Sequence, residues 1–219
     1  MKRIPFEIES FYHIYNRGVD KRVVFNSNKD NFLFIKYLNI LNDIDVVSPR
    51  INGDIEDKSP KKTDQRLVNI IAYCLMPNHF HLLLQEITEG GISKFMQRIG
   101  TAYTMYFNDL NNRSGALFQG VFKSKYIDNE IYLQKIIDYI HLNPVLHKMS
   151  DGVKYMEINW PKLLEQYKWS SYQNYADPLK QSECLQKDIL RKYIEVPKPY
   201  LDWLKNQNNF DAITDIMFD

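Results

Sequence analysis

The segment CLMPNHFHLLLQ, residues 74–85, contains the end of one apolar strand, a Pro-Asn turn and the start of a second strand. Side chains alternate between the two faces of a strand, so His79 and His81 share one face. The opposite face is apolar and carries Phe80, Leu82 and Leu84. The segment therefore predicts a hairpin within a sheet, with one face in the core and two imidazoles on the other.

The residues on either side of this hairpin predict a mixed α/β domain. Apolar, β-branched and turn residues indicate strands at 11–16, 67–76, 79–85 and 115–127, and helices at 28–41, 92–107 and 129–143. This order is that of the ferredoxin-like split βαβ fold, with an antiparallel sheet and an extra C-terminal helix. We therefore expect an α+β fold whose helices lie chiefly on one face of the sheet, leaving the other face open for a site.

The length of 219 residues favours one main domain with an appendage, and we expect that domain to span residues 1–175. Residues 43–66 are polar and contain proline and glycine, which predicts a long exposed loop or inserted segment. Residues 176–219 show a weaker pattern and are expected to form a partly helical tail. The last core helix should end before Pro144, because proline disfavours a helical conformation in the residue before it.

The composition is that of a globular protein with a core, at 44% hydrophobic and 14% aromatic residues. No run of about 18 or more apolar residues predicts a transmembrane helix, and the N-terminus lacks the apolar stretch of a secretory signal. Two cysteines in unrelated contexts indicate reduced thiols in a cytoplasmic protein. The net charge is only +1, but residues 94–125 contain five basic residues and one acidic residue, which predicts a locally basic surface.

The pair His79 and His81 allows two interpretations. Two imidazoles one pleat apart on one strand face can converge on a single cation. An isolated His-x-His pattern is nevertheless weak evidence, because polar residues are also common on a half-exposed strand. The residues around the pair therefore carry the argument for a metal site.

MPNHFHLLL (76–84) resembles the signature of the single-tyrosine transposases of the HUH endonuclease superfamily. The resemblance continues, in family order, through YHIYNRG (12–18), FQGVFKSKYI (118–127), YIHLNPV (139–145) and WSSY (169–172). As a set, these motifs are most similar to the REP-associated tyrosine transposase branch. The resemblance extends from about residue 11 to residue 175.

The resemblance implies a catalytic tyrosine on the last core helix, at Tyr139, and a third metal ligand four residues later, at Asn143. Residues four apart are neighbours on a helix surface. A tyrosine beside the buried face can pack its ring on the core and leave its hydroxyl in a cleft. Tyr132 lies on the same flank and is the alternative nucleophile. The plainer interpretations are a packing role for Tyr139 and a helix C-cap role for Asn143.

The chemistry implied by the resemblance requires a divalent ion, Mg²⁺ or Mn²⁺, held by His79, His81 and Asn143. Such an ion polarises the scissile phosphate as a Lewis acid. Attack by the Tyr139 oxygen gives a 5′-phosphotyrosine and a free 3′-hydroxyl. The phosphotyrosine conserves the energy of the broken bond, so the strand can be rejoined to another 3′-hydroxyl without a nucleotide cofactor.

The segment LFQGVFKSKYI (117–127) interleaves aromatic and basic residues, a combination with which proteins hold single strands. We expect Lys123 and Lys125 to lie near phosphate, with Arg98 and Arg113 as weaker candidates for the same surface. An ordinary edge strand, with phenylalanines inward and lysines outward, has the same pattern. The substrate class, single-stranded DNA near hairpins, comes from the family resemblance alone.

Two further histidines are considered, His141 and His13, of which His13 ranks below the motif pair. His141 is expected on the opposite flank of the last core helix, where it contacts DNA or is exposed. His13 can line the same open sheet face as the motif histidines. The predicted protein acts as a monomer or a homodimer. The alternatives are a non-catalytic RRM-like protein that binds a DNA or RNA hairpin, and a metal-dependent nuclease that uses water.

Overall fold

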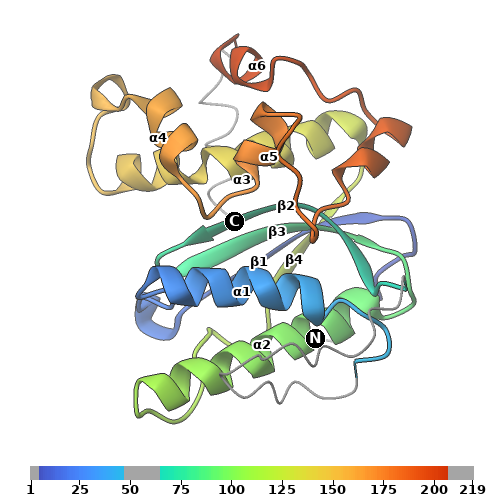
Figure 1. The fold of residues 1–219 in the computed structure, drawn as a ribbon, viewed down its shortest axis with the longest axis vertical. Coiled ribbons are helices and arrows are strands. Elements are labelled where there is room, and N and C mark those ends of the chain that lie inside the picture. Colours follow the sequence, from blue (N-terminus) through green and yellow to red (C-terminus); the bar gives the residue numbers. More distant parts are fainter. Residues whose placement is uncertain (1–4, 47–64, 207–219) are drawn as a thin grey trace.

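The computed structural model describes residues 5–46 and 65–206, and a four-stranded antiparallel sheet lies at its centre (Figure 1). The strands are β1 (Phe11–Arg17), β2 (Val68–Met76), β3 (His79–Glu86) and β4 (Lys123–Ile127). They are ordered β2-β3-β1-β4, and each neighbouring pair is antiparallel. This is the order of the ferredoxin-like split βαβ fold, so the predicted α+β class is confirmed.

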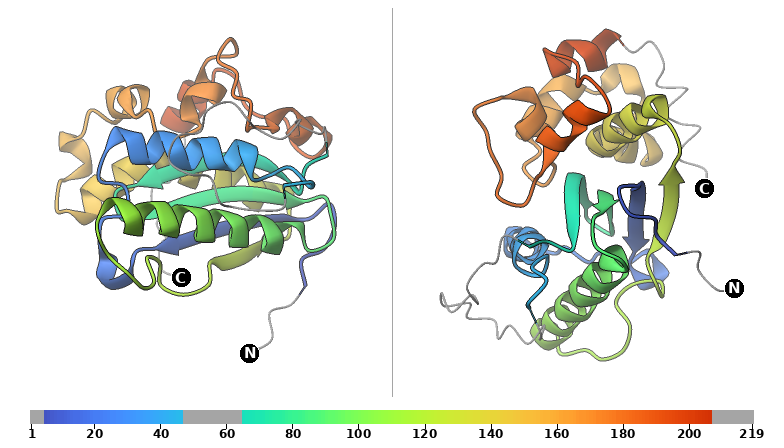
Figure 2. Two further views of the ribbon diagram at one scale, coloured as in Figure 1. Left: turned by 60° about the horizontal axis from the view of Figure 1, so that its bottom comes forward. Right: turned by 90° about the vertical axis from the view of Figure 1, so that its right-hand side faces the viewer.

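Two long helices, α1 (Asn28–Ile40) and α2 (Gly91–Leu110), cover one face of the sheet (Figure 2). Each begins where the sequence supplies acceptors for the free N–H groups of a first turn. At α1, Ser27 and Asp30 form a capping box. At α2, the buried carboxylate of Glu86 accepts hydrogen bonds from the first two N–H groups, at 3.0 and 2.7 Å.

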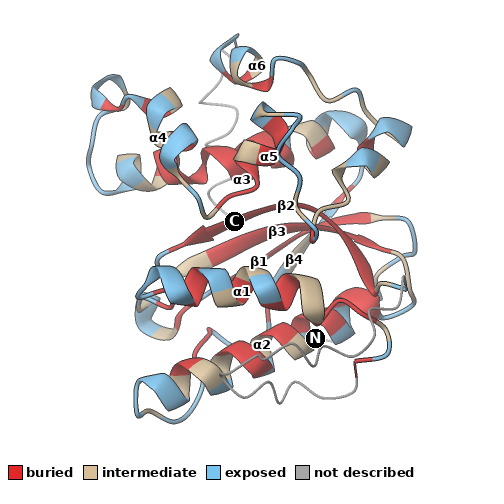
Figure 3. Ribbon diagram, in the orientation of Figure 1, coloured by how far each residue is buried: buried red, intermediate tan, exposed pale blue. Residues whose placement is uncertain are grey.

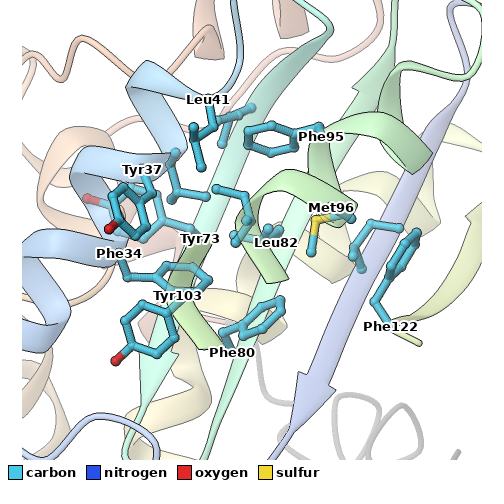
Figure 4. Packing of buried hydrophobic residues seen from close by; sticks show 14 of the residues in the cluster. Phe34, Tyr37, Leu41, Tyr73, Phe80, Leu82, Phe95, Met96, Tyr103 and Phe122 are labelled. Carbon is cyan, nitrogen blue, oxygen red and sulfur yellow. The ribbon is translucent and has the colours of Figure 1, made fainter. Parts of the chain in front are cut away.

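An apolar core fills the layer between these helices and the sheet. Phe80 and Leu82 of β3 point into it, as the strand alternation predicts, and meet aromatic rings from both helices (Figure 4). The ring centre of Phe34, on α1, lies 5.1 Å from that of Phe80 and 5.0 Å from that of Tyr103, on α2. Removing these rings from water is the main stabilising contribution to this half of the domain.

The opposite face of the sheet is covered as well, so the expectation of helices chiefly on one face was wrong. Its helices are α3 (Glu130–Ser150), α4 (Trp160–Gln166), α5 (Tyr172–Ala176) and α6 (Tyr200–Asn206). Short 3-10 helices lie at Val19–Lys21, Tyr155–Glu157 and Lys187–Lys192. Every residue of β2 is buried, and Figure 3 shows buried residues along both α3 and the strands beneath it. A strand that is apolar on both faces requires a second covering layer.

Helix α3 does not end before Pro144 but continues through it to Ser150. Proline lacks an N–H group, so the usual helical hydrogen bond to the carbonyl of Ile140 is lost, at a cost of about 3 kcal/mol. All residues from Ile136 to Leu146 are buried, and their packing on the sheet offsets that cost. Asn143 therefore lies inside the helix, which excludes its C-cap interpretation.

The segment 115–127 was expected to be extended throughout, but only its last five residues form β4. The preceding residues form a loop that turns at Gly120, where φ is +74°, a conformation that favours glycine. Within this loop, Phe118 makes a single antiparallel bridge with Gly18.

Of the predicted insertion at 43–66, residues 47–64 lie outside the described part of the chain. The two ends of the insertion meet, since Asp43 and Arg66 form an antiparallel bridge. The described residues on either side of this segment therefore lie next to each other.

The tail predicted from residue 176 onward is described to residue 206, and helix α5 crosses the predicted boundary at 175. Leu190 and Tyr200 are buried in the same apolar cluster as α3. The described part of the tail is thus part of the layer that covers the second face of the sheet.

A buried polar network ties α3 to this tail. The carboxylate of Asp138 accepts hydrogen bonds from the Gln134 amide (2.8 Å), the Tyr200 hydroxyl (2.8 Å) and the Trp203 indole N–H (3.0 Å). His141 is fully buried, with its ring nitrogens 2.8 Å from the hydroxyl oxygens of Tyr200 and Ser171. The expectation that His141 contacts DNA or is exposed was therefore wrong, because the tail covers that flank of α3.

We expect Asp138→Asn to destabilise the fold by about 1–3 kcal/mol, because the amide brings an N–H donor where the Trp203 indole needs an acceptor. Urea unfolding measures the effect. In a double-mutant cycle, Trp203→Phe should cost less stability in the Asp138→Asn background than in the wild type. Equal costs in both backgrounds would show that the indole N–H is not coupled to this carboxylate.

Candidate active site

A cavity of about 260 Å³ lies between three strands and helix α3. Residues two apart on β1 and on β3 point into it from the sheet, and residues four apart on α3 point into it from the other side. β4 contributes Lys123 and Lys125. The cavity thereby brings together the predicted residues His79, His81, Tyr139, Asn143, Lys123 and Lys125.

The side chain of His79 contacts two amide oxygens. Its Nδ1 lies 2.6 Å from Oδ1 of Asn78, and its Nε2 lies 3.2 Å from Oδ1 of Asn143. The Asn78 amide is oriented by its own nitrogen, which donates to the carbonyl of Lys21 at 3.2 Å. The Asn78 oxygen is therefore placed to accept, which favours a proton on Nδ1 in neutral His79. The Nε2 lone pair then faces the oxygen of Asn143.

His81 is buried and lies against a third imidazole. Its Nδ1 is 2.9 Å from Nε2 of His13, and the two rings stack with centres 5.1 Å apart. His79 approaches His81 edge-on, with ring centres 5.0 Å apart. His13, which the sequence places below both motif histidines as a candidate, is thus in direct contact with one of them.

The three imidazoles are neutral at neutral pH. Burial lowers the pKa of His79 to about 4, an effect that the hydrogen bond with Asn143 partly opposes. Burial also lowers the pKa of His13 to about 3 and that of His81 well below its ordinary value. The positive charge of Arg17 acts in the same direction on both motif histidines. Neutral imidazoles are the form that binds a metal ion.

Tyr139 lies across the cavity from these rings. Its ring centre is 5.3 Å from that of His81 and 5.7 Å from that of His13, in edge-to-face orientations. Burial raises the pKa of the Tyr139 hydroxyl, while the Asn143 amide and the charge of Arg17 act in the opposite direction. At neutral pH the hydroxyl is therefore protonated, with a positive charge nearby.

The residues present fit a hard divalent cation. Two neighbouring ligands about 2.1 Å from an octahedral ion are about 3 Å apart, and His79 Nε2 and Asn143 Oδ1 are separated by 3.2 Å. Two acceptor lone pairs at that distance repel each other unless a positive charge lies between them. Within the described chain, no group of three or more His, Cys, Asp or Glu side chains could hold a metal ion, so a third protein ligand beside the two histidines would be of another type, such as an amide oxygen.

The two lysines of β4 each lie beside an aromatic ring. Lys123 Nζ is 5.8 Å from the ring centre of Tyr15, and Lys125 Nζ is 5.7 Å from that of Tyr132. Tyr132 is therefore next to a lysine at the margin and does not line the cavity as Tyr139 does. Both lysines lie where an anionic strand could reach the imidazoles.

The two predicted arginines lie elsewhere. Arg98, on α2, donates hydrogen bonds to the main-chain carbonyls of Leu41, Asp43, Ile44 and Val46 on the far side of the sheet. Arg113 is held by the side chain of Asn108 and the carbonyl of Ala116. Neither lines the cavity, and both brace local structure through hydrogen bonds that a sequence pattern does not reveal.

Sequence reasoning missed Arg17, His147 and Gln119, which all line the cavity. The signal for Arg17 was present in YHIYNRG, since residues 13, 15 and 17 share one face of β1. His147 could not be found, because it lies beyond Pro144, where the helix was expected to have ended.

Residues 42–143, just under half of the chain, match the family model described as "Transposase IS200 like". This segment contains the two motif histidines, Tyr139 and Asn143. This segment is therefore similar to IS200-like transposases, in line with the resemblance of its motifs, and the match supports a DNA-binding transposase function. No curated protein matches the chain.

A solved structure described as "Structure of the REP associates tyrosine transposase bound to a REP hairpin" is similar to this chain. The similarity covers 83% of this chain and 87% of the other, with a TM-score of 0.52 and 17% sequence identity. At this identity the likeness establishes a shared fold. In the described part of the chain, no helix is both long and apolar enough to span a bilayer.

We expect replacement of Lys123 and Lys125 together by alanine to weaken DNA binding about equally for all sequences. Each lost phosphate contact should lower the slope of log affinity against log salt by about 0.7, or about 1.4 for the pair. Fluorescence anisotropy on a labelled oligonucleotide at several salt concentrations measures the slope.

The matched control is the exposed pair Lys29 and Lys36 on α1, on the other face of the sheet. Its replacement by alanine removes the same charge and should leave the slope unchanged. Equal slopes for the two double variants would place the DNA away from β4.

Proposed function

We propose that this protein is a metal-dependent endonuclease and strand transferase for single-stranded DNA that acts through a 5′-phosphotyrosine at Tyr139. One observation carries the proposal: a single cavity holds Tyr139 beside His81, and Asn143 within hydrogen-bonding distance of His79. The His-x-His pair, the tyrosine and the amide come from separate motifs, and their convergence supports one shared role.

In this reaction the Tyr139 oxygen attacks the scissile phosphorus, and the bond from phosphorus to the 3′-oxygen breaks. The products are a 5′-phosphotyrosine and a DNA end with a 3′-hydroxyl. Burial raises the pKa of Tyr139, so its proton has to leave as the new bond forms. Arg17, whose charge lowers the pKa of Tyr139, favours the developing negative charge.

His79, His81 and Asn143 would hold the divalent ion, Mg²⁺ or Mn²⁺. When bound, such an ion polarises the scissile phosphate and offsets its charge. The residues of this chain orient the strand around it: Lys123 and Lys125 neutralise the backbone, and the ring of Tyr15 beside Lys123 offers a stacking surface for a base.

The proposed substrate is single-stranded DNA next to a hairpin. Support comes from the fold shared with a transposase whose structure is described as bound to a REP hairpin. The basic residues at β4 and β1 flank the cavity on its sheet side, which suits a strand that enters from that side.

Tyr139 is proposed to act with the histidines of its own chain. The distance of 5.3 Å between the ring centres of Tyr139 and His81 supports this, because both residues belong to one cavity within one chain. No residue of a second copy is needed to assemble the set.

We expect Tyr139→Phe to reduce cleavage by more than about a thousandfold and to abolish the covalent adduct, because only the attacking oxygen is removed. Hairpin binding should stay close to that of the wild type, since the ring keeps its packing. The assay is a gel that detects a protein–DNA adduct on a hairpin oligonucleotide with Mn²⁺.

The matched control is Tyr132→Phe, seven residues earlier on the same helix. This variant should form the adduct normally. Cleavage by Tyr139→Phe without an adduct would indicate a nuclease that uses water. A wild type that binds the hairpin and forms no adduct would indicate a non-catalytic binding protein.

We expect a mixture of Tyr139→Phe and His79→Ala chains to form no adduct. Each variant lacks one part of a site that is complete within a single chain, so mixing restores neither. The same gel assay measures this. Recovery of the adduct in the mixture would mean that the tyrosine of one chain serves the histidines of another.

A further inference from the structure

Both candidate ligand histidines are contacted at Nδ1 by a side chain to which the proposed reaction gives no role. The partner of His79 is Asn78, at 2.6 Å, and the partner of His81 is His13, at 2.9 Å. In each case the contact lies on the nitrogen that would not bind the ion. The state of that nitrogen determines whether the other one, Nε2, has a free lone pair.

For His79, the surrounding backbone determines the proton position. The Asn78 nitrogen donates to the Lys21 carbonyl, and the Asn78 carbonyl accepts from the N–H of Gly18 at 2.9 Å. Gly18 has no room for a side chain, because a Cβ there would lie 2.5 Å from the Arg22 carbonyl oxygen. The turn is therefore fixed against the end of β1, with the Asn78 oxygen facing His79.

For His81, the neutral pair with His13 has two arrangements. If His81 donates from Nδ1 to His13, its Nε2 is left with a lone pair. If His13 donates instead, His81 carries its proton on Nε2 and cannot offer that atom to a cation. Only the first arrangement is compatible with a ligand, and it requires His13 to accept at Nε2.

Strand register explains why a histidine is needed at position 13. In the β1–β3 ladder, His13 is paired with Leu83 and Tyr15 with His81. His13 is therefore a diagonal neighbour of His81 on the same face, which only a longer side chain can bridge. Its ring is buried and stacks on His81 with an angle of 20° between the planes.

We propose that His13 and Asn78 are positioning residues that hold His81 and His79 in the Nδ1–H form, so that both Nε2 atoms face one divalent cation. This role rests on the proposed metal site. Neither residue binds the ion, and each acts by accepting a hydrogen bond from a ligand. Such partners of metal-binding histidines typically contribute a factor of 10 to 100 in metal affinity.

The first test reads the proton positions directly in the metal-free wild type. Long-range ¹H–¹⁵N NMR distinguishes protonated from bare ring nitrogens, and the chain has only five histidines to assign. We expect a protonated Nδ1 and a bare Nε2 for both His79 and His81. A protonated Nε2 on either ring would overturn the proposed role of its partner.

The second test compares Mn²⁺ binding, followed by the EPR signal of the free ion, among variants at position 13. His13→Gln places an acceptor where Nε2 was and should keep most of the affinity. His13→Asn carries the same amide one methylene too short and should bind Mn²⁺ about 10- to 100-fold more weakly, as should His13→Leu. Equal affinity of the Gln and Asn variants would overturn the role of His13.

Failure of the positioning role can be distinguished from failure of the proposed reaction. Normal proton positions and Mn²⁺ binding in a wild type that forms no DNA adduct would refute the tyrosine chemistry and support the positioning role. A wild type that binds no Mn²⁺ would overturn the metal site and the positioning role together. Circular dichroism on each variant identifies any that fails to fold. The NMR spectrum of the wild type decides the proton positions without any variant.

Discussion

The packing of α3 on the second face of the sheet is the contact on which the candidate site depends. Ile136, Ile137 and Ile140 are fully buried against β2 and fix the rotation of the helix. With that rotation, Tyr139 and Asn143 face the histidines of β3, and Asp138 and His141 face the tail. Each polar flank has its own partners, so a small rotation would break polar contacts on both sides of the helix at once.

Burial of the three imidazoles lowers the stability of the folded state. Burial of polar rings in a largely apolar layer is unfavourable unless their nitrogens find partners, and the lowered pKa values of the three histidines reflect that burial. Side-chain contacts satisfy Nδ1 of both motif histidines and direct His79 Nε2 toward another acceptor. A site arranged in this way gives up stability, which is common where function requires a strained environment.

The basic residues of the segment 94–125 lie on both faces of the sheet and have different roles there. On the face covered by α1 and α2, Arg98 satisfies main-chain carbonyls beside the predicted insertion. On the face covered by α3, Lys123 and Lys125 stay beside the cavity, and Arg17 joins them from β1. A cluster of charges in the sequence therefore separates in space, and only part of it is available to an anionic strand.

The order of strands and helices along the chain, the α+β class and the His-x-His face could be inferred from the amino-acid sequence, because alternation and helical spacing are local properties. Tyr139 was singled out through the family resemblance of its motif. The course of α3 past Pro144 could not, since it depends on burial that offsets a local penalty. The same holds for His141, which contacts Tyr200 of the tail 59 residues later, and for Arg98, which donates to distant carbonyls. The contact between His13 and His81 joins strands 68 residues apart, and only the register of the folded sheet brings those two rings together.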